Sequence, residues 1–235
     1  MKMSVNRVLS LGLISSTIMG GAQAMAVTIP FTETFNTNAS GWVNGNASPG
    51  AVTYNATGGI GNTGYISQAL SFTSPAGGSF GAPPLQLFFR GNAADDASGD
   101  AFVGNWLTAG VSSFSVSHPH NYTSNLDFYA RIAGSAGAGA SVATGYAIAP
   151  NTWTTITIPI TNSNPPFLSF GSGTFSSAFS GVQNLQIGLY VPANTTFTDL
   201  TLDLDNVSAV PEPATFGLIA MGALASLKRV RRPRA

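Results

Sequence analysis

The chain has 235 residues, with nine basic and nine acidic side chains and no cysteine. Seven of the basic residues lie near the two ends, so residues 27–210 hold only Arg90 and Arg131 against eight carboxylates, a net charge of −6. Two cations cannot neutralise several phosphates, which argues against nucleic acid as a partner, and this charge also repels an anionic polysaccharide unless a divalent cation intervenes. The lack of cysteine excludes disulfides and thiol chemistry.

The N-terminus has the three parts of a secretory signal peptide. Lys2 and Arg7 precede a mostly apolar run over residues 8–20, and the triplets 22–24 and 24–26 read Ala-Gln-Ala and Ala-Met-Ala. Small residues at these positions are what a signal peptidase recognises. We therefore expect residues 1–26 to be removed and the mature protein to be exported.

Alternation of apolar and polar residues with a period of two dominates the chain between the two ends. Ile156 and Ile158, for example, alternate with Thr155 and Thr157. This pattern is typical of strands with one buried face, and Gly, Pro and Asn turn residues separate the segments that show it. Strands are predicted at residues 27–35, 51–54, 65–72, 85–89, 101–103, 112–117, 126–132, 153–160, 185–191 and 200–205.

These short strands predict an all-β domain over residues 27–210, a two-sheet antiparallel β-sandwich of the jelly-roll type. Two segments differ from the rest. The small-residue tract 134–145 is interpreted as a flexible hairpin loop, with a tightly packed strand as the alternative. Residues 162–180 are predicted to be a long loop, whose four phenylalanines pack beneath it or, as the alternative, are exposed.

The last 25 residues divide into a short motif, an apolar run and a basic end. The apolar run, residues 214–227, would form about 21 Å of helix against a hydrocarbon core of about 30 Å, a short transmembrane helix with its basic end in the cytoplasm. The motif is Val210, Pro211, Glu212 and Pro213, and the basic residues are Lys228, Arg229, Arg231, Arg232 and Arg234.

This tripartite tail, paired with a signal peptide, resembles the PEP-CTERM sorting signal of Gram-negative bacteria. The resemblance implies that an exosortase, a membrane-embedded transpeptidase-like enzyme, recognises the tail, and that the protein accompanies exopolysaccharide production. It also implies that the protein is held in the membrane by residues 211–235 and then reaches the cell surface or extracellular matrix. The sorting signal itself would be Val210, Pro211, Glu212, Pro213, Arg229, Arg231 and Arg232.

Residues 31–35, 151–158 and 202–207 are similar to the layout of jelly-roll carbohydrate-binding modules. The resemblance implies that the first and last strands are neighbours, with a structural calcium where an early Glu meets a late Asp. Glu33 and Asp205 stand at the matching places. Calcium takes six to eight oxygen ligands, so backbone carbonyls, an amide or hydroxyl oxygen and water would complete the shell. The alternative is two ordinary surface carboxylates.

A sugar site usually combines a flat aromatic face with amide or carboxylate groups. Trp106 follows the acidic loop that contains Asp95, Asp96 and Asp100, so these four residues are the candidate ligand-binding set, with core packing as the alternative for Trp106. The other two tryptophans, at positions 42 and 153, are predicted to pack inside the domain.

Residues that would support catalysis are sparse. His118 and His120 are the only histidines, and the proline between them predicts a turn with two loop histidines; a metal site shared with Asp127 is the alternative. No catalytic residue is assigned. The favoured function is a non-catalytic surface or matrix protein associated with exopolysaccharide; the alternatives are a carbohydrate-binding module with a structural calcium and a secreted glycan hydrolase.

Overall fold

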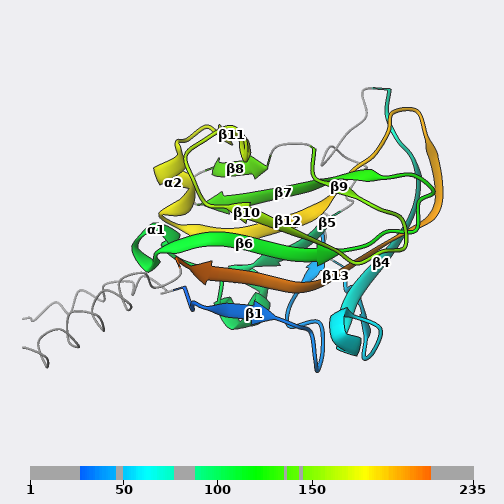
Figure 1. Ribbon diagram of the computed structural model, residues 1–235, viewed down its shortest axis with the longest axis horizontal. Coiled ribbons are helices and arrows are strands. Elements are labelled where there is room, and N and C mark those ends of the chain that lie inside the picture. Colours follow the sequence, from blue (N-terminus) through cyan, green and yellow to red (C-terminus); the bar gives the residue numbers. More distant parts are fainter. Residues whose placement is uncertain (1–26, 46–49, 77–87, 135–136, 143–144, 213–235) are drawn as a thin grey trace, which may run out of the picture.

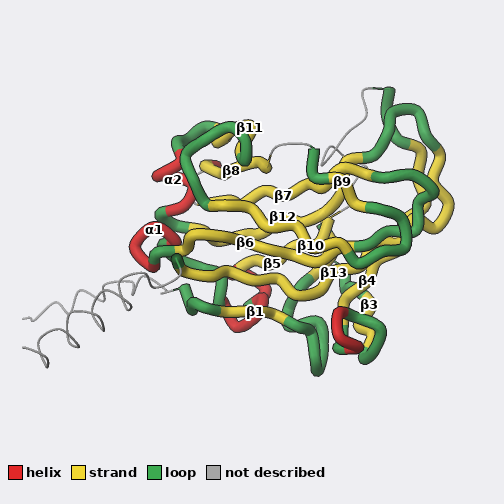
Figure 2. Tube along the Cα trace, viewed as in Figure 1, coloured by secondary structure: helices red, strands yellow, loops and turns green. Residues whose placement is uncertain are grey.

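The computed structural model describes residues 27–45, 50–76, 88–134, 137–142 and 145–212, whose strands form two antiparallel sheets that face each other (Figures 1 and 2). The predicted signal peptide and the apolar and basic parts of the tail lie outside these residues. We name the sheets sheet 1 and sheet 2. Sheet 1 has the order β10 (Thr154–Pro159), β6 (Val111–His118), β13 (Thr196–Pro211), β4 (Tyr65–Thr73) and β3 (Thr53–Asn55), and β1 (Phe31–Glu33) also pairs with β13.

Sheet 2 has a different strand order from sheet 1. Its strands are β11 (Phe167–Gly171), β8 (Ala138–Val142), β7 (Leu126–Gly134), β12 (Val182–Tyr190), β5 (Phe88–Asn92) and β2 (Val43–Asn44), with β9 (Ala147–Ile148) paired to β7. The helical segments in the described part of the chain are η1 (Ile60–Asn62), η2 (Ala93–Asp95), η3 (Ala97–Asp100), α1 (Trp106–Ala109) and α2 (Phe175–Phe179).

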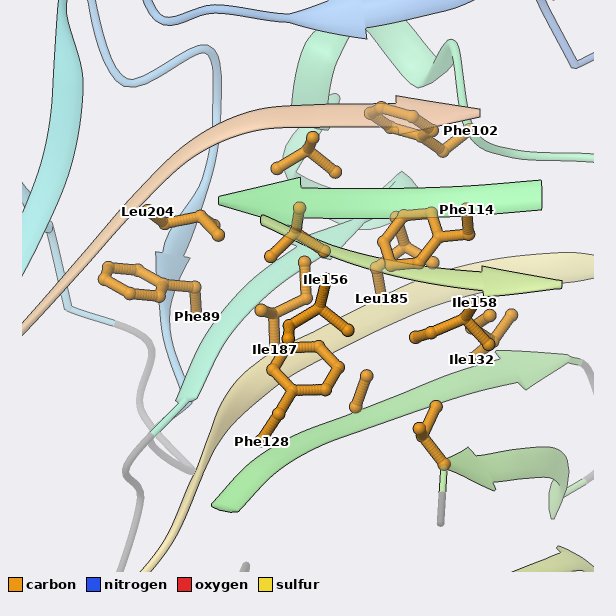
Figure 3. Packing of buried hydrophobic residues seen from close by; sticks show 14 of the residues in the cluster. Phe89, Phe102, Phe114, Phe128, Ile132, Ile156, Ile158, Leu185, Ile187 and Leu204 are labelled. Atoms are coloured by element: carbon orange, nitrogen blue, oxygen red, sulfur yellow. The ribbon is translucent and has the colours of Figure 1, made fainter. Parts of the chain in front are cut away.

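The core lies between the two sheets, because each strand buries every second side chain. On β10, Ile156 and Ile158 are buried while Thr155 and Thr157 are exposed. Figure 3 shows large apolar side chains from both sheets filling the space between them. Burying one such side chain contributes about 1.5–3 kcal/mol, so this interior stabilises a domain that has no disulfides. The labelled core residues include Phe89, Phe114, Phe128, Ile132, Ile156, Ile158, Leu185, Ile187 and Leu204.

The predicted two-sheet antiparallel β-sandwich is confirmed. Strands predicted at residues 65–72, 112–117 and 126–132 match β4, β6 and β7 closely. The strand predicted at residues 101–103 is wrong, because these residues form a turn after η3. Their apolar character reflects burial, since the Phe102 ring packs edge-on against Phe31 with centroids 5.2 Å apart.

The flexible loop predicted at residues 134–145 is also wrong, because β8 lies within it and pairs with β7 and β11. Its small residues permit close approach: a Cβ added to Gly139 would lie 2.9 Å from Nη2 of Arg131. Residues 162–180 are not a plain loop either, since they contain β11 and α2. Their phenylalanines pack as favoured, with Phe167 and Phe179 in the core.

Candidate functional site

The outer face of sheet 2 gathers aromatic, amide and guanidinium side chains. These residues alternate along their strands with core residues such as Phe128, Ile187 and Phe89, so they point away from the other sheet. We call this surface the sheet 2 face. It comprises Asp127, Tyr129 and Arg131 of β7, Asn184, Gln186, Gly188 and Tyr190 of β12, and Phe88, Arg90 and Asn92 of β5.

Strand pairing places these side chains in rows. Gln186 of β12 is the partner of Arg131 on one side and of Arg90 on the other. Antiparallel partners share a face, with Cβ atoms about 4.5–5.5 Å apart, so the three polar side chains form a row across the middle of the sheet. In the adjacent row, Gly188 lies between Tyr129 and Phe88 and adds no side chain between their rings.

The two tyrosines of this face pack edge-on, with the ring centroids of Tyr129 and Tyr190 5.3 Å apart. Burial raises the pKa of the Tyr129 hydroxyl, an effect that Arg131 and a hydrogen bond with Ser141 partly offset. Burial, and to a smaller extent the charge of Asp127, raises the pKa of Tyr190. Both phenols are therefore neutral at neutral pH, and such a hydroxyl can donate and accept a hydrogen bond.

The two arginines are held in different ways. The guanidinium carbon of Arg90 lies 5.6 Å from the centroid of the Phe88 ring, and its Nη2 donates a long hydrogen bond of 3.4 Å to the Gly45 carbonyl. The buried Nε of Arg90 has no hydrogen-bond partner among the described residues. The Arg131 guanidinium lies against the backbone of β8 at Gly139, where the side-chain-free position leaves room for it.

A surface pocket of about 350 Å³ lies at the edge of the sheet 2 face, where β5 ends. In it, Oδ2 of Asp95 accepts a hydrogen bond of 2.6 Å from Nδ2 of Asn92. The side-chain oxygen of Asn184 is buried without a partner in the described part of the chain. The pocket therefore contains polar atoms that a ligand can satisfy. Its lining residues are Arg90, Asn92, Ala93, Ala94, Asp95, Gln183 and Asn184.

The structure does not bring the predicted ligand-binding set together. Trp106 is fully buried and donates from Nε1 to the Phe102 carbonyl at 2.7 Å, which confirms the core alternative and removes its ring from any ligand. Asp95 lines the pocket just described, whereas Asp96 and Asp100 lie on the η2–η3 segment outside its lining. Burial, assisted by Asp96, raises the pKa of Asp100.

The other two tryptophans differ from each other. Trp42 is buried, as predicted. Trp153 is not in the core: it is half-buried on the outer side of sheet 1, where its ring packs edge-on against Tyr65 with centroids 5.6 Å apart. It lines a second surface pocket of about 330 Å³ that also contains Asn121 and Asp203.

The predicted calcium pair does lie where the first and last strands meet. Glu33 of β1 pairs with Val207 of β13, two residues beyond Asp205. Asp205 is fully buried, and its Oδ2 accepts hydrogen bonds from the Ile60 amide at 2.8 Å and the Thr63 hydroxyl at 3.2 Å. Burial raises its pKa, these bonds lower it, and the nearby Glu33 raises it.

Oxygen atoms converge beside this pair. A Cβ added to Gly59 would lie 2.6 Å from Oδ2 of Asp205, 2.6 Å from the Gly64 carbonyl oxygen and 3.0 Å from the Thr63 carbonyl oxygen. That point belongs to the crowded backbone at Gly59, but it shows that the three oxygens lie within about 6 Å of one another. Carboxylate and carbonyl oxygens are ligands that calcium takes. The described residues hold no group of three or more His, Cys, Asp or Glu side chains placed for a metal, so carbonyls would have to supply ligands here.

The prediction of two loop histidines is wrong for His118, whereas His120 lies in the connection between β6 and β7. His118 ends β6 and is fully buried, its Nδ1 facing the Asp203 carbonyl, and His120 is buried with Nε2 2.9 Å from the Ile148 carbonyl. Burial lowers the pKa of His118 to about 4 and lowers that of His120. Both imidazoles are thus neutral at pH 7, and Asp127 lies exposed on the other sheet.

Residues 209–232 match the PEP-CTERM protein-sorting motif, as the tail predicts. The motif indicates an exported protein that is anchored through its C-terminal tail. A search of curated protein sequences finds no match. The described residues contain no helix that is long and apolar enough to cross a membrane, and the predicted tail helix lies outside them.

Solved structures with a similar shape include carbohydrate-active proteins. The CBM22-1-GH10 modules of endo-1,4-beta-D-xylanase 10B from Clostridium thermocellum share 17% identity at a TM-score of 0.47, covering 81% of this chain and 30% of that one. An exo-beta-agarase shares 12% at 0.49, covering 78% and 25%. The family 11 carbohydrate-binding module of Lic26A-Cel5E from C. thermocellum shares 13% at 0.42, covering 79% and 96%. This chain thus spans under a third of the first two proteins, and no function is carried over at this similarity.

Sequence reasoning missed the sheet 2 face, although one signal for it was present. Arg90 and Arg131 are the only basic residues between positions 27 and 227, and each stands at an outward position of a predicted strand or next to one. The alternation in residues 126–132 also places Tyr129 beside Arg131 on the outward side.

Proposed function

We propose that this protein is an exported, non-catalytic polysaccharide-binding protein that uses the sheet 2 face as its binding surface. The observation that supports this most is the row of Arg131, Gln186 and Arg90 on the same face as the half-buried ring of Tyr190, which packs against the buried ring of Tyr129. A pyranose has an apolar face ringed by hydroxyls, so an aromatic side chain packs on the face while amide and guanidinium groups bond the hydroxyls.

The sorting motif supports the cellular setting of this proposal. In the proposed route, an exosortase recognises the tail in the membrane of a Gram-negative bacterium, and the domain is then displayed at the cell surface or in the extracellular matrix. Such a location places the sheet 2 face among exopolysaccharide chains. The function is thus that of a matrix protein which holds a glycan rather than one which cleaves it.

The placement of carboxylates supports the non-catalytic part of the proposal. Glycosidases use two carboxyl groups about 5–9.5 Å apart across the scissile bond. Asp127 belongs to this face and Asp95 lines the pocket beside it, and the two carboxylates lie at opposite ends of the face. Asp127 and Ala133 are six residues apart on β7, a distance of about 20 Å. Ala133 pairs with Asn184, which pairs on its other side with Asn92, the residue that donates a hydrogen bond to Asp95. The two carboxylates are therefore separated by about 20 Å.

Affinity electrophoresis of the full chain in mild detergent, through gels that contain a panel of acidic and neutral polysaccharides, tests the proposal. We expect at least one polysaccharide to retard the chain, and Tyr190→Ala to weaken that binding about tenfold because the ring loses its contact with sugar. Thr157→Ala, on the exposed side of sheet 1, is the control and should bind as the parent does. Failure of every polysaccharide to bind, or equal binding by both variants, would overturn the proposal.

We also propose that one structural calcium binds at Glu33 and Asp205. The converging oxygens of Asp205, Thr63 and Gly64 and the full burial of the Asp205 carboxylate support this assignment. A divalent cation would offset the repulsion between the two carboxylates and join β1 to the loop that contains η1. Its role would be to stabilise the sandwich, at a distance from the sheet 2 face.

A further inference from the structure

The positive charge of the domain is confined to the sheet 2 face. Arg90 and Arg131 are its only basic residues, and both belong to the row that Gln186 joins. Two strand spacings, about 10 Å, separate their backbones. The guanidinium groups lie further apart, because that of Arg131 lies against β8 and that of Arg90 reaches Gly45 beyond β5. A domain with a net charge of −6 therefore presents both of its cations to whatever occupies one surface.

Neither arginine forms an ion pair with a carboxylate in the part of the chain that the structure describes. In the described part of the chain, the partners of the Arg90 guanidinium are a carbonyl oxygen and the Phe88 ring, and its Nε has none. Oδ2 of Asp95, which lines the same pocket, accepts a hydrogen bond from Asn92. Asp127 lies four residues along β7 from Arg131, about 13 Å away, which exceeds the Debye length of about 8 Å at physiological salt.

Six carboxylates between positions 27 and 210 remain besides Asp95 and Asp127. Four of the six lie on sheet 1, with Glu33 in β1 and Asp199, Asp203 and Asp205 in β13. Asp96 and Asp100 follow Asp95 on the η2–η3 segment. The negative potential of these carboxylates weakens the long-range attraction of an anion to the arginines, but salt screens that potential beyond about 8 Å. At contact distance, the row of Arg131, Gln186 and Arg90 is therefore cationic although the domain is acidic.

Guanidinium groups bind carboxylates through paired, charge-assisted hydrogen bonds of fixed geometry. We infer that the sheet 2 face selects an acidic polysaccharide whose repeat carries a uronic acid carboxylate. Arg90 and Arg131 bind carboxylates on successive parts of the chain, Gln186 bonds a hydroxyl between them, and the Tyr190 ring packs on the sugar face. This inference rests on the proposed function and names its substrate class.

The test compares polygalacturonate with the same polymer after its carboxyl groups have been reduced to alcohols. With the full chain in mild detergent, we expect polygalacturonate to bind at least about tenfold more tightly than the reduced polymer, with an affinity that falls as salt rises. Arg90→Gln and Arg131→Gln should each remove most of this preference, and Arg131→Lys should keep part of it because the charge remains without the paired geometry.

The outcomes separate the two proposals. Equal binding of both polymers would overturn the uronate inference while supporting the proposed function, and binding of neither, nor of any polymer in the wider panel, would overturn both. Uronate binding that requires calcium and is unchanged by both Arg→Gln variants would also overturn the inference, because a bridging cation would then replace the arginines. A variant whose melting temperature matches that of the parent is folded, so its loss of binding comes from the substituted side chain. The reduced polymer tests the role of the carboxyl groups without any substitution in the protein.

Discussion

The outer faces of the two sheets obey the same alternation but present different chemistry. On sheet 1, short hydroxyl side chains bond to one another across strands, as in Ser117 with Thr155 and Thr32 with Ser208, each pair at 2.9 Å. On sheet 2, long planar side chains stand in rows and a buried guanidinium nitrogen has no partner among the described residues. A face whose polar groups satisfy one another has little to offer a ligand, so this difference supports the proposal that the glycan binds to sheet 2 rather than to sheet 1.

The largest effect should come from the interior that both faces share. Phe114→Ala in sheet 1 and Phe128→Ala in sheet 2 should each lower the free energy of unfolding by about 3–5 kcal/mol, because both rings are fully buried. Denaturant titration of the two variants measures this. Similar losses in the two variants would show that the sheets differ only on their outer faces. A loss below about 1 kcal/mol in either variant would contradict the view that both sheets contribute to one core.

Acid should destabilise the domain through His118. Its pKa is about 4 in the folded protein, against about 6.5 when unfolded, so the unfolded state binds more protons between these values. Stability is therefore complete above pH 6.5 and falls by roughly 3 kcal/mol as the pH approaches 4. The raised pKa values of Asp203 and Asp205 act in the opposite direction and offset part of this loss.

Unfolding at pH 4, 5, 6 and 7 in the presence of a chelator checks this prediction, with His118→Gln as the comparison. The variant should show a smaller dependence on pH than the parent, whatever its absolute stability. A parent whose stability is the same at pH 7 and pH 4.5, or a variant that keeps the full slope, would show that His118 is not the group responsible.

Calcium should stabilise sheet 1 and leave the sheet 2 face unchanged. At a hundred times its dissociation constant, an ion that binds only the folded state adds about 2.7 kcal/mol, which raises the melting temperature by several degrees. Asp205→Asn and Glu33→Gln should each remove most of this gain. Asp199→Asn, an exposed carboxylate on the same strand, is the control and should retain it. A melting temperature that is the same with calcium and with chelator would show that no calcium binds at this site.

The smallest effect should come from a single methyl group on sheet 2. In Gly139→Ala, the added Cβ would lie 2.9 Å from Nη2 of Arg131, so the guanidinium must move. Because that group is the far end of a flexible side chain, we expect a stability change within about 1 kcal/mol but a several-fold weaker affinity for uronate. Melting and affinity electrophoresis on the same preparation separate the two. Unchanged affinity would show that the position of Arg131 is unimportant.

The alternation in the sequence was enough to predict which residues face inward, but not which strands pair. Residues 126–132 and 154–159 alternate clearly and form β7 and β10. Trp153 has the same parity as the exposed Thr155 and Thr157, so the alternation itself placed it outward, and its size alone suggested the core. The small-residue β8 was missed because its strand character depends on β7 and β11 rather than on its own residues.

The candidate site was less predictable than the fold. Arg90, Gln186 and Arg131 meet only because β5, β12 and β7 are neighbours, and their separation in the sequence gives no local sign of that pairing. Trp106 and the acidic loop are close in the sequence, which favoured them as a site, yet the ring turns into the core. The pairing of the first strand with the last was predicted correctly because the resemblance to a fold supplied the missing long-range information. Calcium binding by Glu33 and Asp205 stays a prediction.

Hydroxyl-radical footprinting of the full chain, with and without a bound polysaccharide, compares the two faces in one experiment. Binding at the sheet 2 face predicts that oxidation of Tyr190 falls when the polysaccharide is present. Oxidation of Trp153 and Tyr65, on the outer side of sheet 1, should not change. Protection of Trp153 with no protection of Tyr190 would place the glycan at the pocket on sheet 1 and contradict the account.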